Sequence, residues 1–160
     1  MSVKIYFDLD GTVFDLYGKA NWLELLENEN PDAFKGEFLP EINLTELHKV
    51  VFELWMNGVE FGVITWLPMN ASPEYQTESA KAKSEWVRKN MGFVTEFNAI
   101  PYGVPKQKAI QQRAKRMYLI DDNSEVCAMW ETAKQRKAVN VNKNFTVVHA
   151  LRKILENLYE

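Results

Sequence analysis

Three segments of the chain are almost continuously apolar and rich in β-branched and aromatic residues. They are residues 3–9, 59–65 and 116–122, and two shorter segments, 96–100 and 137–141, show the same character more weakly. Strands that are buried on both faces of a parallel sheet have this composition. The pattern therefore predicts five strands.

Helical patterns lie between the predicted strands and after the last one. Apolar residues recur on one face in 44–57 and 147–158, whereas helix formers and start signals predict helices in 74–91, 105–115 and 125–136. Strands that alternate with helices predict an α/β fold with a parallel sheet and right-handed crossovers.

Length and composition suit a single globular domain that spans residues 1–160. The net charge of −3 leaves no basic excess to neutralise nucleic-acid phosphates, so we do not expect a nucleic-acid partner, whereas a small phosphorylated substrate is compatible with it. The single cysteine, Cys127, cannot form an intrachain disulfide, which fits a reducing compartment. The sequence has no signal-peptide pattern and no run of roughly 18 apolar residues, so we expect a cytoplasmic protein with no membrane partner.

Polar side chains follow the three strongest predicted strands at the point where each strand ends. In chain order they are Asp8 and Asp10, Thr65, and Asp121 and Asp122. Ligands bind beyond the carboxyl ends of the strands in doubly wound sheets, so we expect these side chains to converge. Carboxylates this close need a cation between them, and Mg²⁺ with its oxygen ligands is the most economical choice.

The sequence DLDGT at residues 8–12 adds the parts of a phosphoryl-transfer site. One carboxylate can attack phosphorus, and the second can protonate the leaving oxygen and later deprotonate water. Gly11 lets the backbone turn sharply and approach a phosphate, while the hydroxyl of Thr65 can bind a phosphate oxygen. A lysine is still needed to offset the negative charge of the transition state.

Lys106 is the predicted phosphate-binding lysine, because it opens the segment that leads directly into the strand carrying Asp121. Lys108 is the alternative. Lys81 and Lys83 are expected to be solvated residues of the preceding helix.

The order of these motifs resembles that of the haloacid dehalogenase (HAD) superfamily of phosphoryl-transfer enzymes. DLDGTV, VIT, a lysine and LIDD follow one another along the chain, and the match runs from residue 3 to about residue 141. The resemblance implies a Rossmann-like core whose five-stranded parallel sheet has the order 3-2-1-4-5 and is flanked by helices. It also implies Mg²⁺ as cofactor and a small cap inserted after the first strand, for which residues 17–42 are available.

The same resemblance implies a role for each catalytic residue. Asp8 is the nucleophile that becomes an aspartyl-phosphate, and Asp10 is the acid/base. Thr65 and Lys106 bind the phosphate. An Asp at position 10 suits a phosphatase better than a dehalogenase or an ATPase.

The metal site is implied in the same way. Asp8 and the backbone carbonyl of Asp10 contact Mg²⁺, and Asp121 is the third protein ligand. Asp122 is expected to support Asp121 without ligating the metal.

Other residues near the motifs are expected to contact the substrate. Gly11 and Thr12 follow the first carboxylate pair directly. Trp66 follows Thr65, where its ring can line the mouth of the site and its backbone N–H can bind phosphate. Tyr17 offers a stacking surface.

A finer resemblance is to the 5'(3')-deoxyribonucleotidase (5'-nucleotidase C) branch of the superfamily. TWLP, AKSEWVRKNMG, PKQKA and LIDDN carry it, together with Asp15 and with Lys83 ahead of Trp86 and Val87. This resemblance implies phosphatase activity on nucleoside or deoxynucleoside 5'-monophosphates. Asp15 either orients the segment after the first strand or caps a helix that starts near Leu16.

The short segment 17–42 leaves other functions open. A small cap also suits a substrate that closes the site itself, such as the phosphorylated end of a polynucleotide or a phosphoprotein. A non-catalytic phosphate-binding module is a further alternative, although no catalytic position of the motifs is replaced.

Overall fold

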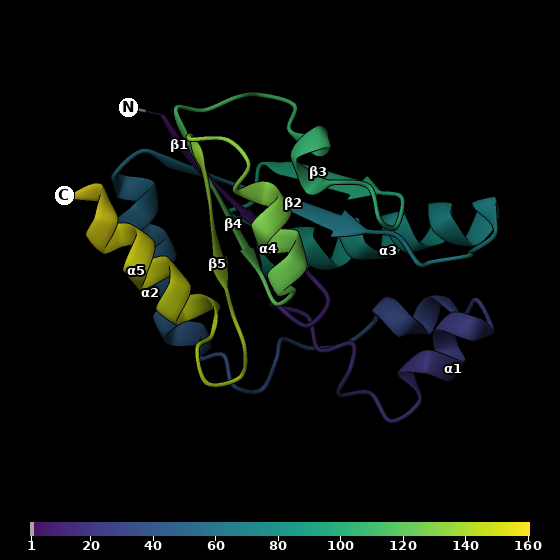
Figure 1. Cartoon of the computed structure of the whole chain (residues 1–160). Helices are drawn as coiled ribbons and strands as arrows, with labels where there is room; N and C mark the ends of the chain where they lie inside the picture. Colours follow the sequence, from purple (N-terminus) through teal and green to yellow (C-terminus); the bar gives the residue numbers. More distant parts are fainter. Residues whose placement is uncertain (1) are drawn as a thin grey trace.

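All five predicted strands form, and they build one parallel sheet in the order β3-β2-β1-β4-β5 (Figure 1). The computed structural model describes residues 2–160. The predicted α/β fold and the strand order 3-2-1-4-5 are therefore confirmed. The strands are β1 (Val3–Phe7), β2 (Val59–Trp66), β3 (Glu96–Ile100), β4 (Arg116–Asp121) and β5 (Arg136–Asn140).

β1 occupies the centre of the sheet, and each of its five residues is buried. Phe7 pairs with Val63 of β2 and with Ile120 of β4, so the residues that follow these three strands leave the sheet at the same edge. The backbone N–H of Asp8 still donates to the carbonyl of Ile120 at 3.0 Å. This register brings Asp8 level with Asp121.

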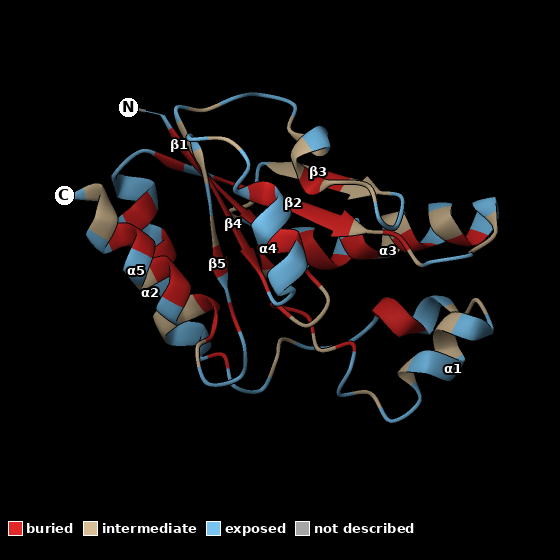
Figure 2. Ribbon diagram, in the orientation of Figure 1, coloured by how far each residue is buried: buried red, intermediate tan, exposed pale blue. Residues whose placement is uncertain are grey.

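Two apolar layers cover the sheet, because alternate residues of each strand face opposite sides. Ile5 and Phe7 share one core with α2, α3 and α5, whereas Tyr6 and Leu119 share the other with α4 (Figure 2). None of the helices among residues 2–160 combines the length and apolar character needed to cross a bilayer. The helices of the layers are α2 (Leu44–Met56), α3 (Pro73–Asn90), α4 (Ser124–Trp130) and α5 (Val147–Leu158).

Two of the predicted helices are shorter than the sequence suggested. The helix predicted at 105–115 is wrong, since only a 3₁₀ turn, η2 (Lys106–Ala109), forms there. The polar residues after Ile110 offer no apolar stripe that a longer helix could bury. The helix predicted at 125–136 ends at Trp130, whose carbonyl accepts a hydrogen bond from Arg136 at the start of β5.

The segment between β1 and α2, residues 17–42, is called the insertion below. It contains α1 (Trp22–Glu27) and the 3₁₀ helix η1 (Pro31–Phe34), and Figure 1 shows it beside the carboxyl edge of the sheet, next to α3. α1 contains no buried residue, whereas Phe34 is buried. The insertion therefore packs against the rest of the protein mainly through η1.

Two polar contacts tie the insertion to the start of α3. The carboxylate of Glu29 accepts hydrogen bonds from the backbone N–H and the hydroxyl of Ser72, at 3.2 and 2.8 Å. The hydroxyl of Tyr75 donates to the carbonyl of Asn30 at 2.9 Å. These contacts set the position of the insertion over the strand ends.

Candidate active site

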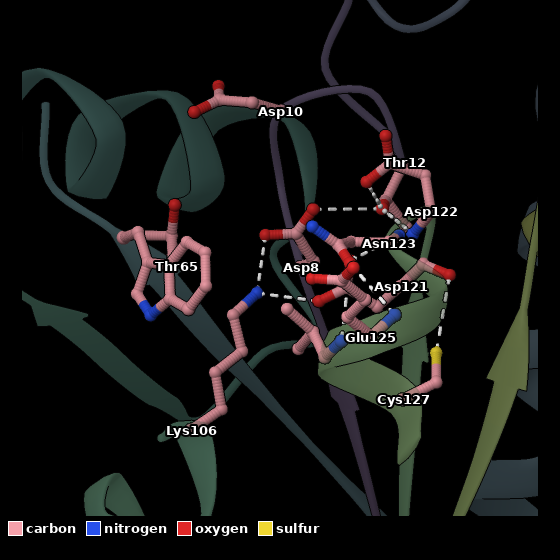
Figure 3. A network of polar contacts seen from close by, with 12 residues as sticks. Asp8, Asp10, Thr12, Thr65, Lys106, Asp121, Asp122, Asn123, Glu125 and Cys127 are labelled. Atoms are coloured by element: carbon pink, nitrogen blue, oxygen red, sulfur yellow. Dashed lines mark hydrogen bonds and ion pairs between the residues drawn. The ribbon is translucent and has the colours of Figure 1, made fainter. Parts of the chain in front are cut away.

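The carboxyl ends of β1, β2 and β4 bring the predicted polar residues together (Figure 3). Asp8, Thr65 and Asp121 are all buried, although each carries a polar side chain. Buried polar groups are stable only when they are paired or hydrogen-bonded. Their partners therefore show how the site is built.

The chain turns sharply after Asp8. The carbonyl of Leu9 accepts hydrogen bonds from the backbone N–H groups of Thr12, Val13 and Phe14. Gly11 sits in this turn with a φ of 81°, and a Cβ there would collide with the carboxylate of Asp122 and the ring of Tyr17.

The hydroxyl of Thr12 links the turn to the end of β4. Its oxygen lies 2.9 Å from Asp8 Oδ2 and 3.2 Å from Asp122 Oδ1, and it accepts from the backbone N–H of Asp122 at 3.1 Å. Sequence reasoning placed Thr12 among the substrate-binding residues. In the structure its hydroxyl holds two carboxylates in place.

Lys106 lies between two of the buried carboxylates. Its Nζ is 2.6 Å from Asp8 Oδ1 and 2.7 Å from Asp121 Oδ2, and the residue is 3% exposed. Burial lowers the pKa of Lys106, but the charges of Asp8 and Asp121 outweigh it and raise the pKa above its usual value. Lys108, the alternative lysine, is exposed.

Lys83 is the residue that sequence reasoning placed wrongly. Lys81 is exposed as predicted, but Lys83 is buried and points into the site. Its Nζ donates to Asp10 Oδ2 at 2.8 Å, to Thr65 Oγ1 at 3.0 Å and to the carbonyl of Trp66 at 2.7 Å.

A signal for this burial is present in the sequence. Tyr75, Ser79, Lys83 and Trp86 follow one another at helical spacing, and all four are buried on the same face of α3. A lysine on the inward face of an amphipathic helix needs an anionic partner at its tip. The pairing with Asp10 provides it.

Three carboxylates form a cluster that could hold a metal ion. Asp8, Asp121 and Asp122 each offer an oxygen, and these oxygens lie within 4.8 Å of one another. Burial and the charge of Asp8 raise the pKa of Asp121 to about 6. Desolvation and the charges of Asp8 and Asp121 raise the pKa of Asp122 as well.

A hard divalent cation fits this donor set, because three carboxylate oxygens match its ligand preference and it relieves their mutual repulsion. Asp122, expected only to support Asp121, thus lies close enough to offer an oxygen itself. The carboxylate of Asp10 lies apart from the cluster (Figure 3), and its Oδ2 contacts Lys83 Nζ. The contact predicted between Asp10 and Mg²⁺ is made by the backbone carbonyl of Asp10, so the position of the Asp10 side chain does not bear on it.

A cavity of about 750 Å³ opens from these carboxylates to the space beneath the insertion. The predicted substrate contacts Tyr17 and Trp66 both line it. Sequence reasoning missed Trp22 of α1 and Tyr102 after β3, which line it as well. The rings of Trp66 and Tyr102 lie 4.9 Å apart, and Trp22 contacts Tyr17 edge to face at 5.0 Å.

Asp15 shapes the entry to the insertion. Its carboxylate accepts a hydrogen bond from the backbone N–H of Gly18 at 3.0 Å. The helix-capping interpretation is wrong, because the first helix starts at Trp22 and not near Leu16. Asp15 instead fixes the turn at residues 15–18.

Comparison with known proteins adds a likeness in fold. No protein-family model matches the sequence, and no curated protein is similar to it. Among solved structures, a D,D-heptose 1,7-bisphosphate phosphatase from Burkholderia thailandensis is similar over 98% of this chain and 98% of its own, with a TM-score of 0.45 and 11% sequence identity. At this level of similarity, function has to be argued from the residues of the site.

Proposed function

We propose that this protein is a Mg²⁺-dependent phosphomonoester hydrolase of the haloacid dehalogenase type, which acts through an aspartyl-phosphate on Asp8. One observation carries the proposal. Asp8, Asp121 and Lys106 are buried together at the carboxyl edge of a parallel sheet, in direct contact and at the floor of a cavity. Phosphoryl transfer needs this combination of a nucleophile and concentrated positive charge.

Asp8 attacks the phosphorus atom of the substrate with one carboxylate oxygen, and the bond from phosphorus to the leaving oxygen breaks. The hydrogen bond from Thr12 holds the other oxygen and orients the carboxylate. Lys106 is placed to offset the charge of the phosphoryl group, because its Nζ already contacts Asp8. Thr65 can donate its hydroxyl proton to a phosphate oxygen.

Asp10 acts as the acid and base of the reaction. It donates a proton to the leaving oxygen and later accepts one from the water that attacks the phosphoenzyme. That second attack breaks the bond between phosphorus and Asp8 and releases inorganic phosphate. The side chain of Asp10 lines the cavity.

Asp8, Asp121 and Asp122 would hold Mg²⁺, together with the backbone carbonyl of Asp10 that the family resemblance implies. The ion supplies positive charge that lets carboxylate and phosphate approach each other. The hydrogen bond from the backbone N–H of Asn123 to Asp121 Oδ1, 2.9 Å long, fixes the orientation of that ligand.

We further propose that the substrate is a nucleoside or deoxynucleoside 5'-monophosphate and that the insertion is the cap of the site. The cavity has a volume typical of sites for small molecules, and its upper walls are largely apolar and aromatic. Trp22 from the insertion and Tyr102 from the core can stack on a base while the phosphate reaches Asp8. The resemblance to the deoxyribonucleotidase branch supports the same substrate class.

Phosphate release across a panel of monophosphates, with and without Mg²⁺, tests this function. We expect Mg²⁺-dependent release that is fastest with nucleoside 5'-monophosphates. Faster release from phosphorylated polynucleotide ends or a phosphopeptide would keep the phosphatase and overturn the substrate class. Binding of phosphate without any turnover would instead identify a phosphate-binding module.

A further inference from the structure

Lys83 has used all of its hydrogen-bonding capacity within the protein. An ammonium group carries three N–H donors. The three partners are a carboxylate oxygen of Asp10, the hydroxyl oxygen of Thr65 and the carbonyl of Trp66, all within 3.0 Å. In this arrangement Lys83 has no donor left for a substrate phosphate, in contrast to a phosphate-binding lysine.

The contacts of Lys83 determine which atoms of its partners remain free. Lysine cannot accept a hydrogen bond, so the oxygen of Thr65 accepts and the hydroxyl proton of Thr65 is left to donate elsewhere. Asp10 is held through Oδ2, whereas its Oδ1 is buried and has no hydrogen-bond partner among residues 2–160. A buried oxygen without a partner is costly unless a ligand uses it.

The insertion covers the ammonium group of Lys83 with the ring of Phe34. The ring of Phe34 lies 4.9 Å from Lys83 Nζ, a cation–π distance, and Phe34 is 3% exposed. Lys83 itself is 3% exposed. The ammonium is therefore shielded from water and fixed at the same time by α3, the end of β2, the turn after β1 and the insertion.

We propose that Lys83 is a positioning residue for the acid step, which aims Oδ1 of Asp10 at the leaving oxygen of the substrate. This inference rests on the proposed function. When the phosphorus–oxygen bond of the ester breaks, the proton of Asp10 passes to the leaving oxygen, and the carboxylate that remains pairs with Lys83. Thr65 is positioned by the same ammonium to donate to the transferred phosphoryl group.

The dependence of rate on the leaving group tests this role. Phosphate esters of aliphatic alcohols need a proton on the leaving oxygen, whereas nitrophenyl phosphates leave readily without one. In Lys83→Met we expect kcat/KM to fall by about 10²-fold or more for alkyl phosphates. The loss for nitrophenyl phosphate should be less than about tenfold. The plot of log kcat/KM against the pKa of the leaving group therefore becomes steeper.

Three further variants distinguish a positioning role of Lys83 from a loss of folding. Lys83→Gln keeps a polar N–H donor but is uncharged and one atom shorter, so it cannot reach the three partners together and should show the same steeper dependence. Lys81→Met, at an exposed position of the same helix, should leave all rates unchanged. In an Asp10→Asn background, Lys83→Met should not steepen the dependence on the leaving group any further, because the acid that it positions is already gone.

An equal loss for all leaving groups in Lys83→Met and Lys83→Gln would overturn the inference, since it indicates a structural role. Unchanged rates in either folded variant would overturn it as well. A wild-type protein that releases no phosphate from any ester would instead refute the proposed function, so the two failures are distinguishable.

Discussion

Two buried lysines divide the candidate active site into two halves, a first half around Lys106 and a second half around Lys83, which use the same type of ion pair in different ways. Lys106 lies between Asp8 and Asp121, where both partners are charged and buried. Lys83 pairs with a single carboxylate, that of Asp10, and donates its other hydrogen bonds to the neutral oxygens of Thr65 and Trp66. The first half concentrates opposite charges, whereas the second fixes the direction of one acid.

The two lysines therefore have different roles under the proposed function. In that function, Lys106 supplies positive charge to the phosphoryl group, because its Nζ contacts Asp8. A lysine with saturated donors is a rigid support. Changes in the first half should therefore affect all substrates, and changes in the second should depend on the leaving group.

Loss of Asp8, the proposed nucleophile, should have the largest effect. Asp8→Asn keeps the size of the side chain and its hydrogen bond from Thr12, so we expect a folded protein. Its phosphate release should fall by about 10⁴-fold or more, because the amide cannot attack phosphorus. Steady-state assays with nitrophenyl phosphate measure the loss, and circular dichroism checks the fold. Turnover close to that of the wild type would show that the first half does not contain the nucleophile.

Removal of the first lysine should have the next largest effect. We expect Lys106→Ala to lower kcat/KM by about 10³-fold for aryl and alkyl phosphates alike. Lys108→Ala, two residues away at an exposed position, is the matched control and should retain full activity. A loss confined to alkyl phosphates would contradict the contrast between the two halves.

Lys106→Ala should also make stability depend on Mg²⁺. Without the ammonium, Asp8 and Asp121 face each other as uncompensated buried charges. A divalent ion can replace the missing positive charge, so we expect a larger rise of Tm on addition of Mg²⁺ than in the wild type. The same shift in both proteins would argue against a shared site for the ion and the lysine's partners.

Loss of Asp121, the proposed metal ligand at the end of β4, should show an intermediate effect. Asp121→Asn keeps the hydrogen bond from Asn123 and removes one negative charge. We expect the Mg²⁺ concentration for half-maximal activity to rise by about 10- to 100-fold, with activity recovered at high Mg²⁺. A titration of initial rate against Mg²⁺ measures it. An unchanged titration curve would remove Asp121 from the metal site.

Loss of the Trp22 ring should have the smallest effect, because this residue lines the cavity and is not one of the charged groups at its floor. Trp22→Ala should raise KM for a nucleoside monophosphate by about tenfold and leave kcat within about twofold. Nitrophenyl phosphate, which has no base to stack on Trp22, should be affected less. Trp55→Ala, an exposed tryptophan of α2, is the control and should change neither constant. An effect on kcat alone would show that the insertion acts on chemistry and not on binding.

The sequence is informative about the first half because its residues stand at strand ends. Asp8 and Asp121 each stand at the end of a strongly apolar strand, so the parallel topology alone predicts that they meet. Lys106 could be predicted from its place before β4, although the helix expected there does not form.

The second half and the cavity were harder to predict because long-range packing creates them. Lys83 lies in a helix rich in charged residues, and only its partner from a distant turn, Asp10, makes its burial possible. The insertion is held by Glu29 on Ser72 and by Tyr75 on Asn30, contacts between segments more than 40 residues apart that no local pattern signals. Trp22 and Tyr102 line the cavity as a consequence of that docking.

Chemical trapping of the intermediate tests the central claim most directly. The enzyme is mixed with substrate and Mg²⁺, quenched with acid and treated with borohydride, which reduces an acyl-phosphate to an alcohol. Tandem mass spectrometry of the peptide that contains residues 5–16 then locates the product. We predict conversion of Asp8 to homoserine only when substrate was present, with Asp10 unchanged. Continued turnover with an unmodified Asp8, or modification of another residue in its place, would contradict the account.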